Sequence, residues 1–279
     1  MTARSVIKEL VPPIFLRVAR RLFPRPAPPR PRPLLPAEHP VTGGPLKGGR
    51  LFVNDSMPSF REMLAGTYDD HLFKALGEAR LDGTLVLDVG AHIGYHALAF
   101  AALLPGSRIA AFEPNPANVE RMRTNLALNP SLMVRVDLLP IALSGSTGSI
   151  QFNSSSNLED QTSSGGYLEG ASKPLGDEVY RKSGFTTSLV ETRRLDDLAA
   201  ERAWPRVGMI KLDVEGAEHL VLSGATEVLR KDGPLLLIEV HSVVCMLEVL
   251  RILHPLGYEA RLLHEDRASR CFISASIPA

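Results

Sequence analysis

Short runs of branched apolar residues alternate along the chain with longer segments whose apolar residues recur at helical spacing. The runs predict strands at 51–55, 85–89, 108–115, 134–144, 186–194, 207–213, 234–241, 258–263 and 271–276. The longer segments predict helices at 68–79 (with Thr67 as N-cap), 95–104, 116–128, 217–229 and 244–253. Nearly continuous apolar strands that alternate with helices indicate an α/β fold, a doubly wound and mostly parallel sheet with helices on both faces.

The pattern is lost over residues 149–170, which are polar and rich in Ser and Gly. We expect a small hairpin and loop, inserted beside the core, with the polar loop over 153–185. Because loops at strand ends vary most freely, this insertion is where we expect substrate choice to reside.

The first 49 residues have a different composition, and we predict a basic, Pro-rich and largely disordered arm, with the folded domain over 50–279. The most apolar run of the arm, LVPPIFL, is short and holds two prolines, which excludes a membrane span, and no secretory cleavage pattern follows it. Residues 14–23 have amphipathic helical spacing. They would form either a frayed helix on a disordered leader or a surface that contacts an anionic membrane or a partner. PRPAPPRPRPLLP (24–36) predicts an extended linker.

Charge is balanced over the whole chain, with 31 basic and 31 acidic residues, but it is unevenly spread. Residues 1–35 hold eight Arg or Lys and one Glu, a net charge of +7, which leaves −7 on the rest. An acidic body argues against nucleic-acid binding. The two cysteines, Cys245 and Cys271, lie in no metal-binding motif, so we expect neither zinc nor a disulfide framework. A cytoplasmic protein, at most peripheral to the inner face of a membrane, fits best.

The stretch LVLDVGAHIGYHALAF (85–100) predicts a strand, a tight turn and the start of a helix. It lacks both the dinucleotide fingerprint GxGxxG and the P-loop. Asp88 would repel a pyrophosphate but suit an amine, Gly90 permits a sharp turn, and Gly94 lets the helix approach a ligand. Glu113 follows at the end of the next strand, where an acid can bind both ribose hydroxyls. Together these features predict S-adenosylmethionine as cofactor.

A second informative stretch is IKLDVEGAEHLVLSGATEVL (210–229), where ionisable groups follow a buried strand. Lys211 and Asp213 share one face of that strand, because side chains alternate with period two. PLLLIEVH (234–241) brings Glu239 and His241 to the end of the neighbouring strand. We therefore expect Asp213, Glu215, Glu239 and His241 near one cleft. Glu218 would either join them or simply occupy the first helical turn, where negative charge is favoured.

The stretches LDVGAHIGYHALAF, AFEPNP, IALSGSTGSIQF, RRLDDL, IKLDVEGAEHLVLSGA and LLIEVH occur in the order typical of FkbM-family methyltransferases, which the chain resembles from about Arg50 to Arg270. The resemblance implies a class I methyltransferase fold. It also implies methylation of a hydroxyl oxygen on a sugar, glycolipid or polyketide-type product. The chain departs from the family at the turn, where His92 replaces the common Asn; if the side chain at that position orients the substrate, the substrate would differ.

Carried over to this chain, the resemblance predicts a set of cofactor-binding residues. They are Asp88, Gly90, Ala91, Gly94, Tyr95, Glu113, Asn115 and Ala142. The turn would contact the methionine part, Glu113 the ribose, and Ala142 with Ile141 the adenine. Asp137 is a candidate for reading the adenine amino group.

The candidate catalytic residues are Asp213, His241, Lys211, Glu215 and Glu239. The enzyme must align a hydroxyl with the sulfonium and remove its proton, and alignment contributes on the order of 7–11 kcal/mol at best. His241 is the expected base, and Asp213 would accept the proton or orient the hydroxyl. Alternatively, Asp213, Glu215 and Glu239 would hold Mg²⁺; we favour metal-free catalysis. Lys211 would neutralise these acids, hold a substrate oxygen or be structural.

Two other classes of function remain open: a NAD-type dehydrogenase on a related fold, which the broken fingerprint disfavours, and a non-catalytic binding or scaffold protein. The expected partner of an enzyme with these groups is a small molecule or a glycan that offers a hydroxyl.

Overall fold

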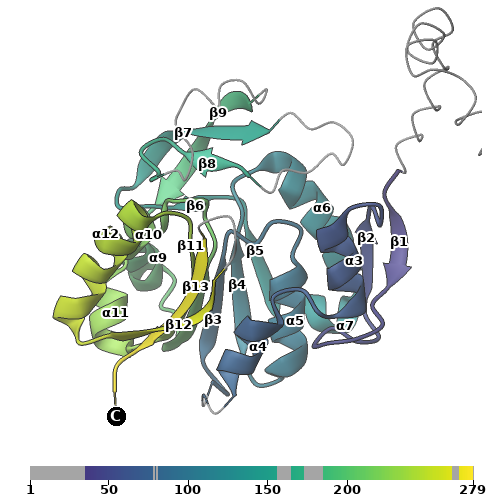
Figure 1. Ribbon diagram of the computed structural model, residues 1–279, viewed down its shortest axis with the longest axis horizontal. Helices are drawn as coiled ribbons and strands as arrows, with labels where there is room; N and C mark the ends of the chain where they lie inside the picture. Colours follow the sequence, from purple (N-terminus) through teal and green to yellow (C-terminus); the bar gives the residue numbers. More distant parts are fainter. Residues whose placement is uncertain are drawn as a thin grey trace, which may run out of the picture. The chain divides into compact units, whose positions relative to one another are not determined.

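Seven strands form the central sheet of the computed structural model, in the order β12-β13-β11-β10-β3-β4-β5 (Figure 1). They are β3 (Leu85–Val89), β4 (Arg108–Phe112), β5 (Val136–Leu139), β10 (Val207–Leu212), β11 (Leu235–Val240), β12 (Glu259–Glu265) and β13 (Cys271–Ser276). β13 runs antiparallel to β11 and to β12, and the pairs from β11 to β5 are all parallel. The predicted doubly wound, mostly parallel sheet is confirmed, and its order reverses between β3 and β10, where such folds bind ligands.

The structure describes residues 35–77, 79, 81–155, 165–172, 185–265 and 270–278. The predictions of a disordered leader, an amphipathic segment and most of the proline-rich linker therefore lie outside the described residues. So does most of the predicted 153–185 loop. Within the described part of the chain, no helix is long and apolar enough to cross a membrane.

Helices cover both faces of the sheet (Figure 1). On one face lie α3 (Pro58–Ala65), α4 (Asp70–Leu76), α5 (Tyr95–Leu103), α6 (Pro116–Ala127) and α7 (Pro130–Met133), and on the other α9 (Leu195–Glu201), α10 (Glu218–Ser223), α11 (Thr226–Asp232) and α12 (Val243–Leu253). Strand β3 contributes side chains to the hydrophobic cores on both faces of the sheet, because successive side chains point to opposite faces. Val86 packs with the first group of helices, and Leu87 and Val89 pack with the second.

Two predicted helices differ in the structure. The segment predicted as one helix over 217–229 forms α10 and α11, which are separated at Gly224; this glycine passes so close to the Ser144 carbonyl that a Cβ there would overlap it. The helix predicted at 68–79 is the shorter α4, and its N-cap is Asp69 rather than Thr67. Helix α3 was not predicted, although Pro58 in its first turn and Gly66 in the left-handed region after it are typical helix boundaries.

A second sheet of four strands lies over the carboxyl edge of the central sheet (Figure 1). Its order is β6-β9-β7-β8, formed by β6 (Ala142–Leu143), β9 (Phe185–Arg193), β7 (Gly148–Ser155) and β8 (Tyr167–Leu168). The antiparallel pair β7–β8 confirms the hairpin predicted within 149–170, and β9, predicted as a separate strand, pairs antiparallel with the other side of β7. The strand predicted over 134–144 is divided between the two sheets, because the chain leaves the central sheet at Pro140, which has no N–H for a ladder.

The folded region begins before the predicted boundary at Arg50. Strand β1 (Ala37–Pro40) pairs antiparallel with β2 (Arg50–Val53), and the side chains of Val41 and Leu46 are buried. Asn125 and Asn129 accept hydrogen bonds from the N–H groups of Phe52 and Arg50. The proline and glycine content of this segment resembles a linker, but its two apolar side chains and its strand pairing join it to the domain.

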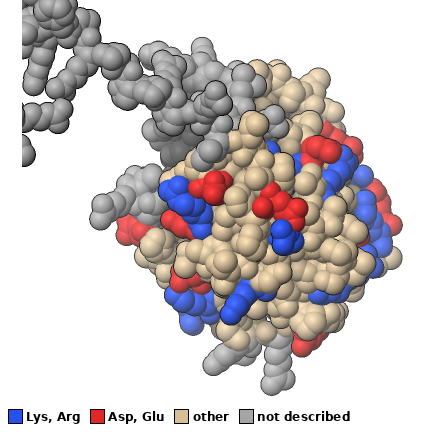
Figure 2. Space-filling model, turned by 90° about the vertical axis from the view of Figure 1, so that its right-hand side faces the viewer, with Lys and Arg blue, Asp and Glu red and all other residues tan. Residues whose placement is uncertain are grey.

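On the face that Figure 2 shows, Lys and Arg side chains lie in small groups among Asp and Glu side chains. Exposed ion pairs of this kind, such as Arg108 with Asp137, recur among the described residues. They contribute little to stability individually. The described part of this face offers no broad basic surface of the kind that binds a phosphate backbone.

Candidate functional site

A cavity of about 400 Å³ opens at the carboxyl ends of β3, β4, β10 and β11. Helix α3 and the second sheet supply its other walls, through residues such as Met63, Phe152 and Leu168. Of the sequence-predicted site residues, those that line the cavity are Gly90, Glu113, Ala142, Asp213, Glu215 and Glu239. The sequence therefore identified the edge of the sheet at which the cavity lies.

Glu113 follows β4 and is almost completely buried. Its Oε2 accepts a hydrogen bond from the His92 N–H at 2.8 Å, and its Oε1 accepts from the Asn115 N–H at 2.9 Å and Asn118 Nδ2 at 3.2 Å. Burial raises the pKa of Glu113 to about 7, although these hydrogen bonds oppose the increase. The carboxylate is thus fixed in position at the cavity wall.

The turn after β3 depends on Gly90, which has a φ of 80°. A Cβ at this position would overlap the carbonyl oxygen of Asp213, because the ends of β3 and β10 approach closely there. His92 has a φ of 49°, a left-handed conformation that His and Asn tolerate better than most residues. Its ring lines the cavity and stacks on Phe60, with ring centroids 6.2 Å apart. Burial lowers the pKa of His92 to about 4, so this imidazole is neutral.

The other predicted cofactor residues lie behind the cavity wall and do not line it: Asp88, Ala91, Gly94, Tyr95 and Asn115. The expectation that Gly94 makes room for a ligand differs from the structure, in which a Cβ there would lie 2.8 Å from Met122 Cγ of α6. Asn115 caps α6 through a hydrogen bond from the Ala117 N–H. Arg108 Nη2 donates hydrogen bonds to both carboxylate oxygens of Asp137 on the surface, and Asp137 does not line the cavity, which removes it as a candidate for reading adenine.

Lys211 is a buried counter-ion. Its Nζ lies 3.3 Å from Asp88 Oδ1 and 3.6 Å from Asp213 Oδ2, and it donates a hydrogen bond to the Gly90 carbonyl at 3.1 Å. Lys211 does not line the cavity, so among its three predicted roles the geometry supports neutralisation of the neighbouring acids.

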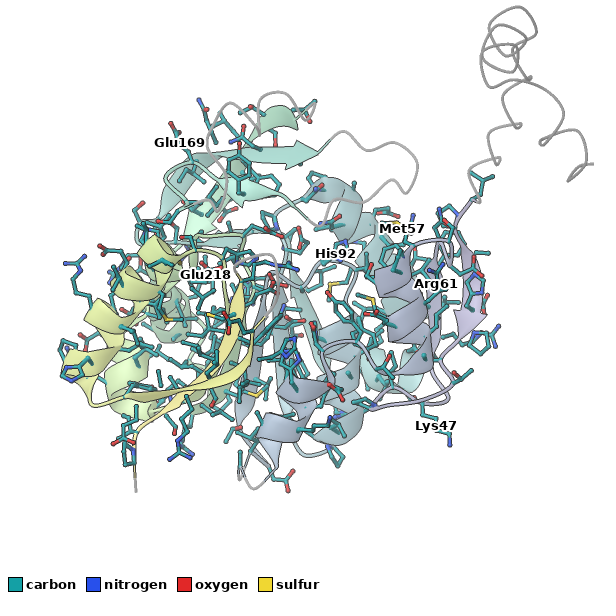
Figure 3. All side chains as sticks on the ribbon, in the orientation of Figure 1. Lys47, Met57, Arg61, His92, Glu169 and Glu218 are labelled. Atoms are coloured by element: carbon teal, nitrogen blue, oxygen red, sulfur yellow. The ribbon has the colours of Figure 1, made fainter. Side chains whose placement is uncertain are left out.

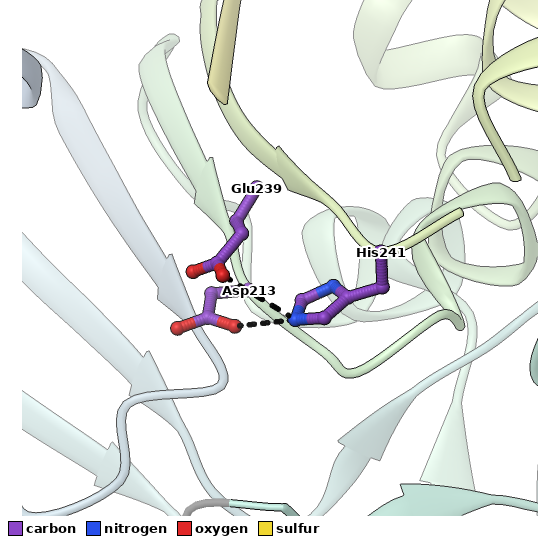
Figure 4. A group of neighbouring side chains, drawn as sticks. All are labelled: Asp213, Glu239 and His241. Carbon is purple, nitrogen blue, oxygen red and sulfur yellow. Dashed lines mark ion pairs between the residues drawn. The ribbon is translucent and has the colours of Figure 1, made fainter. Parts of the chain in front are cut away.

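His241 lies among the acidic residues of the site. Its Nε2 lies 3.7 Å from Asp213 Oδ1 and 3.5 Å from Glu239 Oε1 (Figure 4). It also lies 3.4 Å from Glu215 Oε2. Its Nδ1 lies 2.8 Å from Glu218 Oε1. The sequence correctly placed Asp213, Glu215, Glu239 and His241 in one group.

The electrostatics of this group disfavour His241 as the base. Burial opposes a charge on its ring, but the hydrogen bond to Glu218, with Glu215 and Asp213 nearby, raises the pKa of His241 to about 10. Burial raises the pKa of Glu215 to about 7 and that of Glu239 to about 8. Burial would also raise the pKa of Asp213, but Lys211 and His241 hold it below its ordinary value. An imidazole that is already protonated accepts no proton, and His241 does not line the cavity.

Sequence reasoning left the role of Glu218 open and missed two other contributors to the site, Arg270 and Tyr68. Glu218 is fully buried and holds His241, a pairing that the fold creates across 23 positions of the chain. Arg270 lines the cavity and its Nη1 lies 2.9 Å from Glu239 Oε1. Tyr68, which precedes α4, also lines the cavity. Figure 3 labels His92 and Glu218, which lie toward the carboxyl edge of the sheet from opposite helical layers. No local sequence signal marks Tyr68 or Arg270, because only tertiary packing brings them to this edge.

A seven-stranded sheet of this order, with its cavity at the ends of the central parallel strands, defines the class I methyltransferase fold. The solved structure of methyltransferase FkbM from Methylobacillus flagellatus shares it, with a TM-score of 0.50 and 19% identity over 71% of this chain and 45% of that one. The model of the methyltransferase FkbM domain matches residues 88–260, and the chain belongs to this family.

Two relatives carry more specific names. The 2-O-methyltransferase NoeI of Sinorhizobium fredii is 32% identical over 149 residues, which cover 53% of this chain and 59% of that protein. The hexuronic acid methyltransferase AglP of Haloferax volcanii is 29% identical over 193 residues, which cover 68% and 70%. The match thus spans about three fifths of NoeI and a larger part of AglP.

Proposed function

We propose that the protein transfers a methyl group from S-adenosylmethionine to a hydroxyl oxygen of a sugar, a glycolipid or a polyketide-type natural product. The observation that carries this proposal is Glu113, a buried carboxylate held at the cavity wall beside the glycine turn of β3. Family membership supports the same reaction.

The residues present fit the cofactor. Glu113 presents its carboxylate to the cavity for the two ribose hydroxyls, and Ile141 and Ala142 provide an apolar wall for the adenine. Gly90 lines the cavity at the end of β3, where the methionine part would pass. S-adenosylmethionine supplies a methyl group on a positively charged sulfur, so the donor needs no further activation.

The acceptor half of the cavity is acidic. Asp213, Glu215 and Glu239 line it, and Arg270 is the cation on the same wall. Glu215 is suited to accept the hydroxyl proton at its carboxylate, because its side chain is partly exposed to the cavity while His241 is enclosed. Glu215 has a φ of 53°, and a strained backbone at a non-glycine residue is common at functional sites. Asp213 and Arg270 would orient the acceptor, and alignment contributes more to rate than proton removal.

The names of the relatives favour a sugar as acceptor. One is a 2-O-methyltransferase and another methylates a hexuronic acid. A sugar offers adjacent hydroxyl groups, and several carboxylates can accept hydrogen bonds from them. We therefore expect the methyl acceptor of this chain to be a glycoside rather than an aromatic compound or a peptide.

The test is transfer of labelled methyl groups to a panel of hexuronic-acid and neutral hexose glycosides, with the product located by mass spectrometry and NMR. We expect an O-methyl product, and we expect Glu215→Gln to lower kcat by roughly 10²–10⁴-fold, the usual contribution of a base, while S-adenosylhomocysteine binding is retained. Methylation at nitrogen or carbon, or an unchanged kcat in Glu215→Gln, would contradict the proposal.

A further inference from the structure

The cluster around His241 has the geometry of a metal site. One donor atom each from Asp213, Glu239 and His241 lies within 4.8 Å of the others. Metal–ligand bonds of about 2.1 Å place the donor atoms around one ion roughly 3–4 Å apart, and the Nε2–Oδ1 and Nε2–Oε1 distances are 3.7 and 3.5 Å. Small side-chain shifts would bring all three atoms to one ion.

His241 provides a second and independent observation. Its side chain is only 1% exposed, and its Nε2 forms no hydrogen bond with any described residue although it points between Asp213 and Glu239 (Figure 4). A buried ring nitrogen that has carboxylates nearby but forms no hydrogen bond is costly unless a ligand completes its contacts.

The other nitrogen of the ring is fixed in the way that metal-binding histidines usually are. Nδ1 lies 2.8 Å from Glu218 Oε1 and donates a hydrogen bond to this carboxylate, and a bound ion would replace the proton on Nε2. Glu218 is itself held by the Gly216 N–H at 3.1 Å and by Cys245 Sγ at 2.7 Å. In many metal sites a carboxylate orients a histidine by binding one ring nitrogen, and the other nitrogen binds the ion. Glu218 holds His241 in this way.

The neighbouring cations leave room for an additional positive charge. Lys211 faces Asp213 Oδ2, whereas Oδ1 of that residue faces His241. Arg270 contacts Glu239 at Oε1, the oxygen that also faces His241, and lies outside the group of three ligands. Together with Glu215 and Glu218, four carboxylates surround one imidazole.

We propose that Asp213, Glu239 and His241 bind a divalent first-row transition metal ion. An imidazole nitrogen beside two carboxylates suits Mn²⁺, Fe²⁺ or Zn²⁺ better than Mg²⁺, which takes oxygen ligands. The sequence predicted a different set, with Glu215 in place of His241. Binding of the ion stands by itself, but its role rests on the proposed function: the ion would hold the acceptor hydroxyl and lower its pKa.

The test is a titration of the metal-free full-length protein with Mn²⁺, without any cofactor, by calorimetry and electron paramagnetic resonance. We expect one ion per chain, with coupling to an imidazole nitrogen that disappears in His241→Gln. Asp213→Asn and Glu239→Gln should each weaken Mn²⁺ binding by about tenfold or more. The matched control is Glu62→Gln, which alters a carboxylate of the same cavity outside the cluster and should leave Mn²⁺ affinity unchanged.

Thermal unfolding and S-adenosylhomocysteine binding of each metal-free variant establish that it is folded. They also separate this inference from the proposed function, because the cofactor site is tested without metal. No Mn²⁺ binding up to about 1 mM, the weak end of divalent-cation sites, would overturn the inference. Nitrogen coupling that persists in His241→Gln, or an unchanged Mn²⁺ affinity in Asp213→Asn, would also overturn it.

Discussion

Lys211 Nζ lies 3.3 Å from Asp88 Oδ1, with both side chains almost completely buried beneath the cavity. The two residues are register partners on β10 and β3, so the pairing of the central strands brings them together. The Asp88 carboxylate forms no hydrogen bond with any described residue. The ion pair with Lys211 is therefore the main interaction that offsets the cost of burying this carboxylate. Asp88 therefore supports the floor of the cavity through Lys211, a role different from the predicted contact with the cofactor.

The ion pair predicts a large effect of Lys211→Met. Removing one partner leaves Asp88 charged and buried, which should lower the free energy of unfolding by about 3–5 kcal/mol. Denaturant unfolding measures this change. The double variant Lys211→Met with Asp88→Asn should recover much of the loss, because no uncompensated charge remains. Equal stability of the single and double variants would show that the pair is not coupled.

The glycine turn predicts a position-specific cost. Gly90→Ala should lower the free energy of unfolding by more than about 2 kcal/mol, because the new Cβ adds an overlap with Asp213 to the strain of a positive φ. Gly83→Ala is the matched control, with a φ of 76° and no atom within 4 Å of the added Cβ. It should cost only the strain, about 1 kcal/mol, in the same unfolding experiment. Equal losses at the two positions would contradict the close approach of β3 and β10.

The environment of Glu113 predicts a pH dependence of stability. Burial raises its pKa from 4.5 to about 7, so between these values the folded chain binds the proton more tightly than the unfolded chain. The stabilising contribution of Glu113 is complete below about pH 4.5 and is lost as the pH rises through about 7.

The comparison of wild type with Glu113→Gln isolates this effect. Between pH 5 and 8, the free energy of unfolding of the wild type should fall relative to that of the variant, by a difference on the order of 3 kcal/mol at most. Denaturant unfolding across that range gives the difference directly. A constant offset between the two proteins would mean that Glu113 is ionised throughout.

The sequence predicted the layout of the site because its signals are local. Buried strands and the acids that follow them appear in the apolar pattern, and strand alternation places Lys211 and Asp213 on one face. The same pattern does not separate the residues that line the cavity from those behind it. Gly94 illustrates the limit, since its missing Cβ accommodates Met122 of another helix rather than a ligand.

Long-range partners account for the remaining differences. The pKa of His241 suits a base in isolation, but the contact with Glu218 depends on the packing of α10 against the end of β11. Val41 and Leu46 were assigned to a disordered arm because proline and glycine surround them, and only the pairing of β1 with β2 shows that they belong to the folded domain.

We propose that Glu113 binds the ribose of S-adenosylmethionine and that the Gly90 turn contacts its methionine part. Calorimetric titration of the full-length protein with S-adenosylhomocysteine tests it most directly, beside Glu113→Ala and with NAD as the competing ligand. We expect binding to the wild type that weakens by tenfold or more in Glu113→Ala, about 1.4 kcal/mol, and no comparable binding of NAD. Absence of S-adenosylhomocysteine binding, or tighter binding of NAD, would contradict the methyltransferase assignment.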